Sequence, residues 1–542
     1  MYKGAYVILP APQHTGTVFL GSLLTGVLPP ITTWQAVLIR LCSERLLASP
    51  CPAINRQPGE KIAVASKKLN EIIVAATVIT HQEKPMEFHS INPANGEKLA
   101  SYDEMGREAV QGILEQCDAA QARWQKTTFA ERARSMRAVH DLLLANKKAY
   151  ATLMTEEMGK VYPQGIAEVE KCALVCRYYA DHAERFLAPE DVATEAHHSF
   201  VVFKPLGVVL AVMPWNFPLW QVFRFAAPTL MAGNGALLKH ASNVFGCALL
   251  IERVFREVGF PEHLFRSLLI GRSQTTEVIH NPLVAAITIT SSVDAGRAVA
   301  AAAGRALKKC VLELGGSDPF IVLEDADVDR AVEVGIKSRF QNNGQSCIAA
   351  KRFIVVEEVY ERFERQLVEK ASRLIMGDPM SKGTDIGPLA RIDLRDGLHD
   401  QVRRSVAAGA RLLLGGEVPA GPGAFYPATV LAGVTKGMAA WSEELFGPVA
   451  TLIRVRDEKE AIEVANDTEF GLGSAVWTRD LVRGERIASE EIESGAAFVN
   501  DMSKSDLRMP FGGIRHSGYG RELSIFGIRE FVNVHSVWVS EI

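Results

Sequence analysis

Residues 200–218 read FVVFKPLGVVLAVMPWNFP, and the pattern of apolar residues that begins here decides the fold. Short runs of apolar, β-branched residues end here at a turn bounded by prolines. Further runs of this kind follow, separated by helical stretches: GALLKHASN (235–243), AAITITSS (285–292) and KKCVLELGG (308–316). Strands that alternate with helices are typical of a parallel sheet covered by helices. The sequence therefore predicts an α/β fold with a Rossmann-type domain.

Two neighbouring regions extend this prediction. Residues 106–185 carry apolar residues at spacings of three and four, which predicts helices. A second alternation of apolar runs and helical stretches extends from residue 319 to about 501, which predicts a second α/β domain. A chain of 542 residues, 48% of them hydrophobic, is long enough for two or three domains.

Composition excludes several classes of partner. The formal net charge is −4 and there is no run of Lys or Arg, so a groove for nucleic acid has no electrostatic support. The eight cysteines show no spacing of a zinc site or a disulfide framework, so we expect no metal site and a reducing compartment. We interpret Cys172 and Cys176, four residues apart, as packing on one face of a helix.

Residues 1–85 differ from the rest of the chain, with eight Lys and Arg against four Glu. Their apolar run, VFLGSLLTGVLPP, is shorter than the roughly 20 residues that cross a bilayer, and no later run is long enough. It also lacks the flanking charges of a signal peptide, and a transit peptide would be richer in Arg and Ser. We expect residues 1–85 to be a disordered leader outside the fold, with Met86 as a possible start and no membrane partner.

The glycine pattern GxGxxG of dinucleotide-binding turns is absent. GNGALL (233–238) begins correctly but lacks the third glycine. Polar residues nevertheless follow several predicted strands, and ligands of parallel sheets bind at the carboxyl ends of strands.

Three residues of reactive type each have two interpretations. Cys347 lies in the polar loop RFQNNGQSCIAAKRF (339–353), where it is either a small hydrophobic residue or a nucleophile. Asn216, between the prolines of PWNFP, is either a turn residue or a rigid amide donor for an oxyanion. Glu313, at the end of an apolar strand, is either an exposed charge or a base whose pKa is raised by burial.

Five motifs in order decide between these interpretations: PWNFP, ELGGSDP, NNGQSC, EELFGP and PFGG. Over about residues 88–540, the chain resembles the aldehyde dehydrogenase superfamily. The resemblance implies that the Cys347 thiolate attacks an aldehyde, while the Asn216 side chain and the Cys347 N–H hold the oxyanion. Hydride transfer to nicotinamide then leaves a thioester, which is hydrolysed by a water that Glu313 activates.

The resemblance also implies a cofactor, NAD or NADP, and its contacts. Many NAD-preferring members have a glutamate where this chain has Ser242. Without that carboxylate, the 2′-phosphate of NADP meets less repulsion, so we expect NADP to be tolerated. The expected cofactor-binding residues are Trp215, Lys239, Ser242, Ser292, Glu444 and Phe446.

For the substrate, the chain looks most like the bacterial NAD(P)-dependent succinate-semialdehyde dehydrogenases. This resemblance implies that Arg224 holds the substrate carboxylate, with Ser505 nearby; a salt bridge between domains is the alternative role for Arg224. Another short aliphatic or aromatic aldehyde is the alternative substrate. A binding or structural oligomer without catalysis is the alternative of another class.

The resemblance finally implies the domain organisation. Residues 86–188 and 207–313 would form the cofactor domain and residues 314–523 the catalytic domain. Residues 189–206 and 524–542 would form a bridging β segment, which extends the sheet of a partner in a homodimer or homotetramer. We expect a cytoplasmic location, or the mitochondrial matrix if residues 1–85 are a transit peptide.

Overall fold

The computed structural model describes residues 86–541, so the expectations for the leader lie outside the described residues. The described chain begins with a hairpin of β1 (Glu87–Ile91) and β2 (Lys98–Asp103). Within this part of the chain, no helix has both the length and the hydrophobicity that a bilayer crossing needs.

Three helices follow in the region where the apolar spacing predicts them. They are α3 (Arg107–Trp124), α4 (Phe129–Met158) and α5 (Tyr162–Phe186). Thr128 and Glu131 form a capping box at the start of α4, and Gly159 ends this helix in the left-handed conformation. Cys172 and Cys176 are buried on α5, which confirms that they pack on one face of a helix.

The first large sheet has six strands in the order β17-β9-β8-β5-β6-β7, all parallel except β17. Its strands are β5 (Val208–Met213), β6 (Gly235–His240), β7 (Phe265–Ser267), β8 (Val284–Thr290), β9 (Lys309–Glu313) and β17 (Gly518–Tyr519). The connecting helices are α6 (Trp220–Met231), α7 (Phe245–Glu257), α8 (Arg272–His280) and α9 (Val293–Arg305). The predicted Rossmann-type parallel sheet is thus confirmed.

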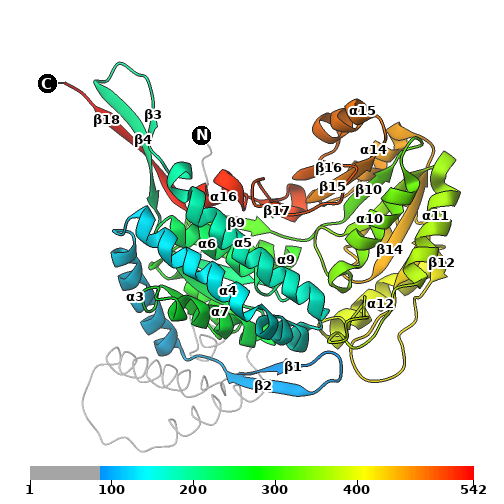
Figure 1. Cartoon of the computed structure of the whole chain (residues 1–542), viewed down its shortest axis with the longest axis horizontal. Helices are drawn as coiled ribbons and strands as arrows, with labels where there is room; N and C mark the ends of the chain where they lie inside the picture. The colour runs from blue at the N-terminus through cyan, green and yellow to red at the C-terminus, as the bar shows by residue number, and fades with distance from the viewer. Residues whose placement is uncertain (1–85, 542) are drawn as a thin grey trace, which may run out of the picture. The chain divides into compact units, whose positions relative to one another are not determined.

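Both faces of this sheet are covered (Figure 1). Along β5, Val209 and Ala211 pack into the core formed with α4, α5, α6 and α7. Val208 and Leu210 face the opposite side, where α3, α8 and α9 cover them. Because both sides are buried, the strands are continuous apolar runs rather than alternating ones.

The second large sheet has seven strands in the order β12-β13-β14-β11-β10-β15-β16, with only β12 antiparallel to its neighbour. Its strands are β10 (Asp318–Val322), β11 (Ala350–Val356), β12 (Arg411–Leu414), β13 (Thr429–Ala432), β14 (Val449–Val455), β15 (Gly473–Trp477) and β16 (Ala496–Val499). Helices α10 (Val328–Phe340) and α11 (Glu357–Ser372) pack on one face, and α12 (Ile392–Ala407) and α14 (Glu458–Asn466) pack on the other.

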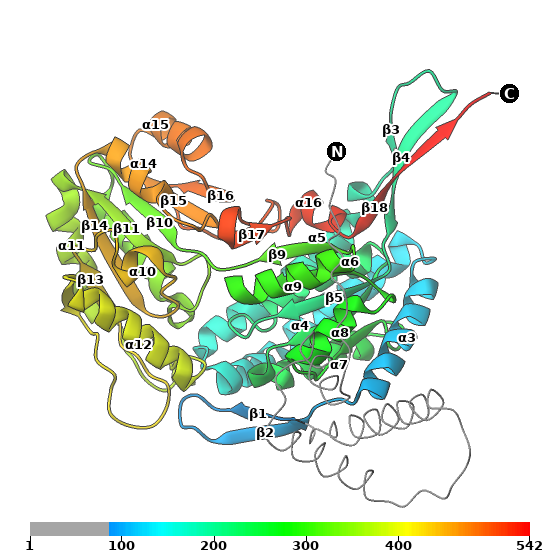
Figure 2. The same cartoon turned by 180° about the vertical axis from the view of Figure 1, so that it is seen from behind.

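A three-stranded sheet, β18-β4-β3, stands apart from these helices in both views (Figures 1 and 2). It consists of β3 (Glu190–Asp191), β4 (His198–Pro205) and β18 (Val532–Val539). The division of the chain into domains stays a prediction. In the structure, β17 connects residues assigned to the catalytic domain with the six-stranded sheet, because it pairs with β9.

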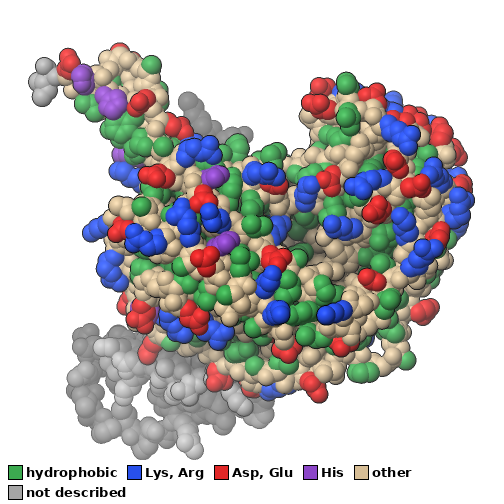
Figure 3. Space-filling view, viewed as in Figure 1, with side chains coloured by type: hydrophobic (Ala, Val, Ile, Leu, Met, Phe, Trp, Pro, Cys, Tyr) green, Lys and Arg blue, Asp and Glu red, His purple; other side chains and the backbone are tan. Residues whose placement is uncertain are grey.

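Short elements complete the described fold: η1 (Ser242–Val244), η2 (Gln341–Gly344), α13 (Ala439–Ser442), α15 (Leu481–Arg486), η3 (Ile487–Glu491), η4 (Arg515–Ser517) and α16 (Ser524–Arg529). Acidic and basic side chains are interspersed over the face shown in Figure 3. This face therefore carries no broad patch of one sign that would follow a phosphate backbone.

Candidate active site

Cys347 lies in the connection between α10 and β11, after a tight left-handed turn. The backbone angle φ is 53° at Asn342, 57° at Asn343 and 73° at Gly344. A Cβ atom on Gly344 would lie 2.3 Å from the backbone of Gly447, so only glycine fits. The Asn343 amide donates to the carbonyls of Gly159 and Pro388, at 2.9 Å in both cases. Packing and hydrogen bonds therefore fix the loop that presents the thiol.

Asn216 follows β5 and is tied directly to the Cys347 loop. Its Nδ2 donates to the Gln345 carbonyl at 3.1 Å, and its Oδ1 accepts from Gln221 Nε2 at 3.1 Å. Asn342 Nδ2 donates to the Asn216 carbonyl at 2.8 Å. An amide nitrogen carries two hydrogens, so one N–H of Asn216 is left to donate to an oxyanion. The structure thus brings Asn216 and the Cys347 loop together.

A buried ion pair that sequence reasoning missed supports this turn. Lys160 pairs with Glu168, and its Nζ also donates to the Asn216 carbonyl at 3.0 Å. Glu168 accepts from the N–H groups of Leu219 and Trp220 at the start of α6, at 3.0 and 2.9 Å. An acidic residue at a helix N-terminus satisfies donors that the helix itself cannot. No local pattern marks this pair, because Lys160 and Glu168 stand among other charged residues such as Glu157 and Glu170.

The charges around Cys347 act in opposite directions. As a whole residue, Cys347 is half-buried. Burial of its surroundings raises the pKa of Cys347 to about 12, and the charges of Lys351 and Arg224 act to lower it. Lys351 Nζ donates to the carbonyls of Ser346 and Cys347 at 2.8 and 2.7 Å and pairs with Glu444 at 3.4 Å. The resting thiol is therefore protonated at neutral pH, and the two cations stabilise the thiolate when it forms.

Glu313 ends β9 inside the protein. No described group hydrogen-bonds either of its carboxylate oxygens. Burial and the neighbouring Glu522 raise the pKa of Glu313 well above its usual range, the direction expected from the sequence, while Arg224 acts to lower it. A Cβ atom on Gly512 would lie 2.7 Å from Glu313 Oε1, so the glycine leaves room for the carboxylate. Such a carboxyl group can take a proton without first breaking hydrogen bonds.

Arg224 lies on α6, where it forms a buried ion pair with Glu522. Its Nη2 also donates to Thr290 Oγ1 at 3.4 Å, and its guanidinium carbon lies 4.7 Å from the centre of the Phe511 ring. The salt bridge that we gave as the alternative role is therefore present, and the contact with a substrate carboxylate stays a prediction. A Cβ atom on Gly316, three residues after Glu313, would lie 2.6 Å from the Cys347 carbonyl oxygen, so the segment that follows Glu313 packs against the Cys347 loop.

The expected adenosine and phosphate contacts lie at the carboxyl ends of strands. Lys239 is half-buried near the end of β6, and Ser242 begins η1 directly after it. Ser292 is exposed and precedes the first turn of α9, where backbone N–H groups favour a phosphate. Burial lowers the pKa of Lys239, and the charge of Arg272 lowers it further. No carboxylate of the described chain pairs with either cation, which fits a cofactor that carries an additional phosphate.

Trp215, which precedes Asn216, contacts the EELFGP motif through Phe446. The rings of Trp215 and Phe446 are edge to face, with their centres 5.8 Å apart. Glu444 Oε1 accepts from the Gly316 N–H at 3.1 Å and is held by Lys351. The structure therefore brings these three predicted cofactor residues close to the Cys347 loop.

Ser505 is buried and meets a residue that sequence reasoning missed. Lys171 on α5 donates from Nζ to Ser505 Oγ at 2.6 Å. The same ammonium lies 4.1 Å from the centre of the Trp220 ring. Because Lys171 is far from Ser505 in the sequence, no local pattern could have indicated this pair.

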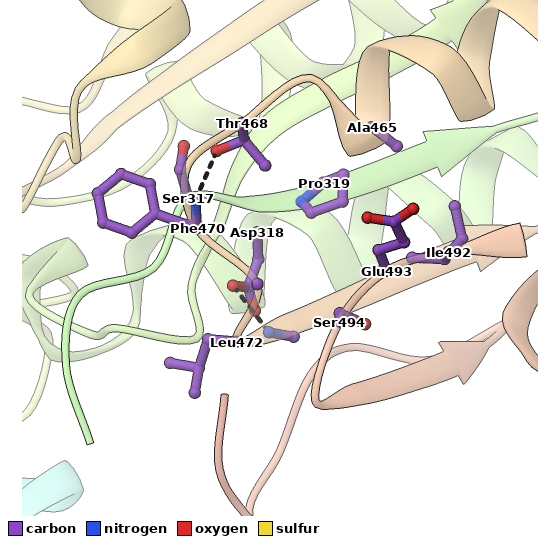
Figure 4. A pocket seen from close by; sticks show the side chains of 12 residues that line it. Ser317, Asp318, Pro319, Ala465, Thr468, Phe470, Leu472, Ile492, Glu493 and Ser494 are labelled. Carbon is purple, nitrogen blue, oxygen red and sulfur yellow. Dashed lines mark hydrogen bonds between the residues drawn. The ribbon is translucent and has the colours of Figure 1, made fainter. Parts of the chain in front are cut away.

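A separate recess lies at the edge of the seven-stranded sheet (Figure 4). It is lined in part by Asp318, Thr468 and Glu493, and it includes none of Cys347, Glu313 or Asn216. Asp318 accepts from the Gly473 N–H at 3.1 Å, and burial raises its pKa to about 6. Among residues 86–541, no three His, Cys, Asp or Glu side chains are grouped so that they could hold a metal ion.

Comparisons with known proteins agree with this geometry. The sequence profile of the aldehyde dehydrogenase family matches residues 79–537. The chain is 50% identical to a "Probable succinate-semialdehyde dehydrogenase [NADP(+)]" of Synechocystis, over 84% of this chain and 100% of that protein. It is 47% identical to "Succinate semialdehyde dehydrogenase [NAD(P)+] Sad" of Escherichia coli, over 84% of this chain and 98% of that protein.

A solved structure shares the fold. The succinic semialdehyde dehydrogenase from Streptococcus pyogenes, in complex with NADP+, superposes with a TM-score of 0.82 and 37% identity. The match covers 84% of this chain and 100% of that chain.

Proposed function

The chain belongs to the aldehyde dehydrogenase family, and we propose that it oxidises succinate semialdehyde to succinate through a thioester on Cys347. The observation that carries this proposal is the convergence of three groups on one region. Asn216 donates to the Gln345 carbonyl of the Cys347 loop, and Gly316, three residues after Glu313, packs against the Cys347 carbonyl. The relatives named above support the choice of substrate.

The first step joins the Cys347 sulfur to the aldehyde carbon. The thiol proton passes to solvent, and as the carbon–sulfur bond forms, the π electron pair of the C=O bond moves to oxygen, giving an oxyanion that accepts from Asn216 Nδ2 and the Cys347 N–H. Lys351 and Arg224 favour this step because they stabilise the thiolate. When bound, the nicotinamide cofactor supplies the two-electron oxidant that converts the adduct to a thioester.

The second step hydrolyses the thioester. Glu313 takes a proton from water, the water oxygen bonds to the acyl carbon, and the carbon–sulfur bond breaks to release succinate and the thiolate. The unpartnered oxygens of Glu313 support this role, because both can accept a hydrogen bond from water.

NADP or NAD is the cofactor. Lys239 and Arg272 would meet a 2′-phosphate without a competing carboxylate, and Ser242 follows Lys239 by three residues as the first residue of η1. Ser242→Glu should lower kcat/KM for NADP about 10- to 100-fold and change that for NAD less, because it adds a negative charge. Steady-state kinetics with both cofactors measures the ratio, and Ser242→Gln is the uncharged control. Equal losses with the two cofactors would contradict this placement.

We further propose a cytoplasmic homodimer or homotetramer. The free edge of β18 and the exposed side chains of Val534 and Trp538 support this proposal, because such an edge can continue the sheet of a second copy. Light scattering during size-exclusion chromatography measures the assembly, and an elution as a monomer would contradict it.

The test of the function compares succinate semialdehyde with butanal, which has the same chain length and no carboxylate. We expect NAD(P)H formation that favours succinate semialdehyde, and its complete loss in Cys347→Ala. An equal or higher kcat/KM for butanal would identify another short aldehyde as the substrate. No turnover of any short aldehyde by the folded protein would support a role in binding or structure only.

A further inference from the structure

We propose that Lys171, together with Ser505, binds the carboxylate of the aldehyde substrate and thereby sets the preference for acidic aldehydes. This inference rests on the proposed function and names the group that recognises its substrate. It assigns the main recognition of the carboxylate to a lysine on α5 rather than to Arg224 on α6.

The first observation is the charge balance of the two cations. Arg224 is paired within the protein: its guanidinium forms a buried ion pair with Glu522 and also contacts Thr290 and Phe511. Lys171 forms no ion pair with any Asp or Glu of residues 86–541, and the only hydrogen-bond partner of its ammonium there is the neutral Ser505. Of the two cations, Lys171 is the one without a carboxylate partner among residues 86–541.

The carboxylates nearest to Lys171 are engaged elsewhere. Glu168 is bound to Lys160 and to the first N–H groups of α6. Asp506 accepts a bidentate pair of hydrogen bonds from the guanidinium of Arg508. Neither is available to neutralise Lys171, so a carboxylate from outside the protein would be the first to pair with it.

The second observation is the cost of leaving this cation unpaired. Burial and the charge of Arg224 lower the pKa of Lys171 to about 8, although Glu168 and Asp506 act to raise it. A partly buried ammonium with such a pKa is stabilised strongly by an incoming anion. A bound carboxylate would therefore supply the counter-charge that the ammonium of Lys171 lacks among the described residues.

The third observation is geometric. Ser505 Oγ accepts from Lys171 at 2.6 Å, which leaves the serine hydrogen free to donate. Two donors next to each other match the two oxygens of a carboxylate. The Trp220 ring holds the ammonium from the other side, with its centre 4.1 Å from Nζ.

This group belongs to the same wall as the nucleophile. Trp220 lies four residues after Asn216, at the start of α6, and packs in the apolar cluster that also includes Cys347, Ile348 and Leu507. Lys171 contacts Trp220, and Asn216 donates to the Gln345 carbonyl two residues before Cys347, so the start of α6 joins the cation to the nucleophile loop. An apolar wall between a thiol and a cation suits an aldehyde whose other end is a carboxylate.

The experiment measures kcat/KM for succinate semialdehyde and for butanal in five proteins: wild type, Lys171→Met, Lys171→Arg, Arg224→Met and Lys504→Met. Lys504 is the matched control, since it adjoins Ser505 but is exposed and paired with Asp501. We expect Lys171→Met to lose about 10- to 100-fold on succinate semialdehyde, mainly through KM, and less than threefold on butanal. Lys171→Arg should recover part of this loss, and Lys504→Met should change neither substrate.

Three outcomes separate the inference from the proposed function. If wild type does not prefer succinate semialdehyde, the proposed substrate is wrong. If wild type prefers succinate semialdehyde and Lys171→Met keeps this preference, the inference that Lys171 binds the substrate carboxylate is wrong. If Arg224→Met lowers kcat/KM for succinate semialdehyde at least tenfold more than kcat/KM for butanal, Arg224 is the clamp instead.

A measurement on wild type alone keeps the inference testable should Lys171→Met fail to fold. Because the charge of Lys171 is lost above its pKa of about 8, KM for succinate semialdehyde should rise between pH 7 and pH 9. KM for butanal should stay constant over this range. The other charged or titratable groups that act on Lys171 are Arg224, Cys172, Glu168 and Asp506. A parallel rise for both substrates would overturn the inference.

Discussion

The two walls of the candidate active site are stabilised by different kinds of interaction. On the side of Cys347, the side-chain amides of Asn216, Asn342 and Asn343 donate to backbone carbonyls. The ammonium groups of Lys160 and Lys351 donate to further carbonyls of the same loops. On the side of Glu313, buried charges face one another and the carboxylate has no hydrogen-bond partner among the described residues.

The hydrogen bonds on one side fix where the side chains lie, whereas the charges on the other side set the protonation of Glu313. Hydrogen-bonded amides fix a side chain in place at little electrostatic cost. A buried carboxyl near a second carboxyl and a cation is left free to move, but its pKa is set by these neighbours. The nucleophile loop is therefore adapted for precise placement, and the Glu313 side is adapted for proton transfer.

The strongest test of this comparison is Glu313→Gln, which keeps the shape of the side chain and removes its basicity. We expect turnover to fall about 10²- to 10⁴-fold while the first burst of NAD(P)H persists, because the thioester forms but is not hydrolysed. Stopped-flow absorbance measures both phases. In wild type, turnover should rise with pH through a pKa above the usual range of a glutamate, since only the carboxylate accepts a proton. Loss of the burst would show that Glu313 also takes the proton of the thiol.

The next effect is expected from Asn216→Ala on the hydrogen-bonded side. Loss of the oxyanion donor should slow the burst about 10²- to 10³-fold, with little change in the affinity for the cofactor. Asn146→Ala is the control, because its amide donates only to a carbonyl within α4. A burst that slows less than tenfold would mean that the Cys347 N–H stabilises the oxyanion alone.

Lys351→Met should have a smaller effect, and it probes where the two walls meet. Removing the cation disfavours the thiolate, so the pKa of Cys347 should rise further and the burst at pH 7 should slow about tenfold. The pH dependence of the burst rate measures this shift, and Lys351→Arg should restore it in part. A slower burst with an unchanged pH dependence would indicate that Lys351 acts only by holding the Ser346 and Cys347 carbonyls.

The smallest effect is expected from Gln221→Met. Gln221 donates to Asn216 Oδ1 and so fixes the direction of the amide, but it would not touch the substrate. Loss of one neutral hydrogen bond should slow the burst about two- to tenfold. A loss as large as that of Asn216→Ala would show that this single contact orients the donor, whereas no change would leave that task to Gln345.

Much of the fold could be predicted because its strands are short apolar runs that end at polar motifs. The positions of Asn216, Glu313 and Cys347 could be anticipated for the same reason, since each follows or precedes such a run. The pairing of Arg224 with Glu522 and of Lys171 with Ser505 could not, because these contacts join residues that are distant in the sequence. The sequence shows that a buried cation is present but not which anion reaches it.

Gly512 carries a consequence for engineering. A methyl group there would overlap the space of the Glu313 carboxylate, and the backbone angle φ of 156° disfavours other residues as well. A mutant library designed to broaden aldehyde preference should therefore keep this position constant, whatever chemistry is sought. Substitutions at residue 171 would instead change the recognition of the substrate carboxylate and leave the hydrolysis of the thioester unaffected.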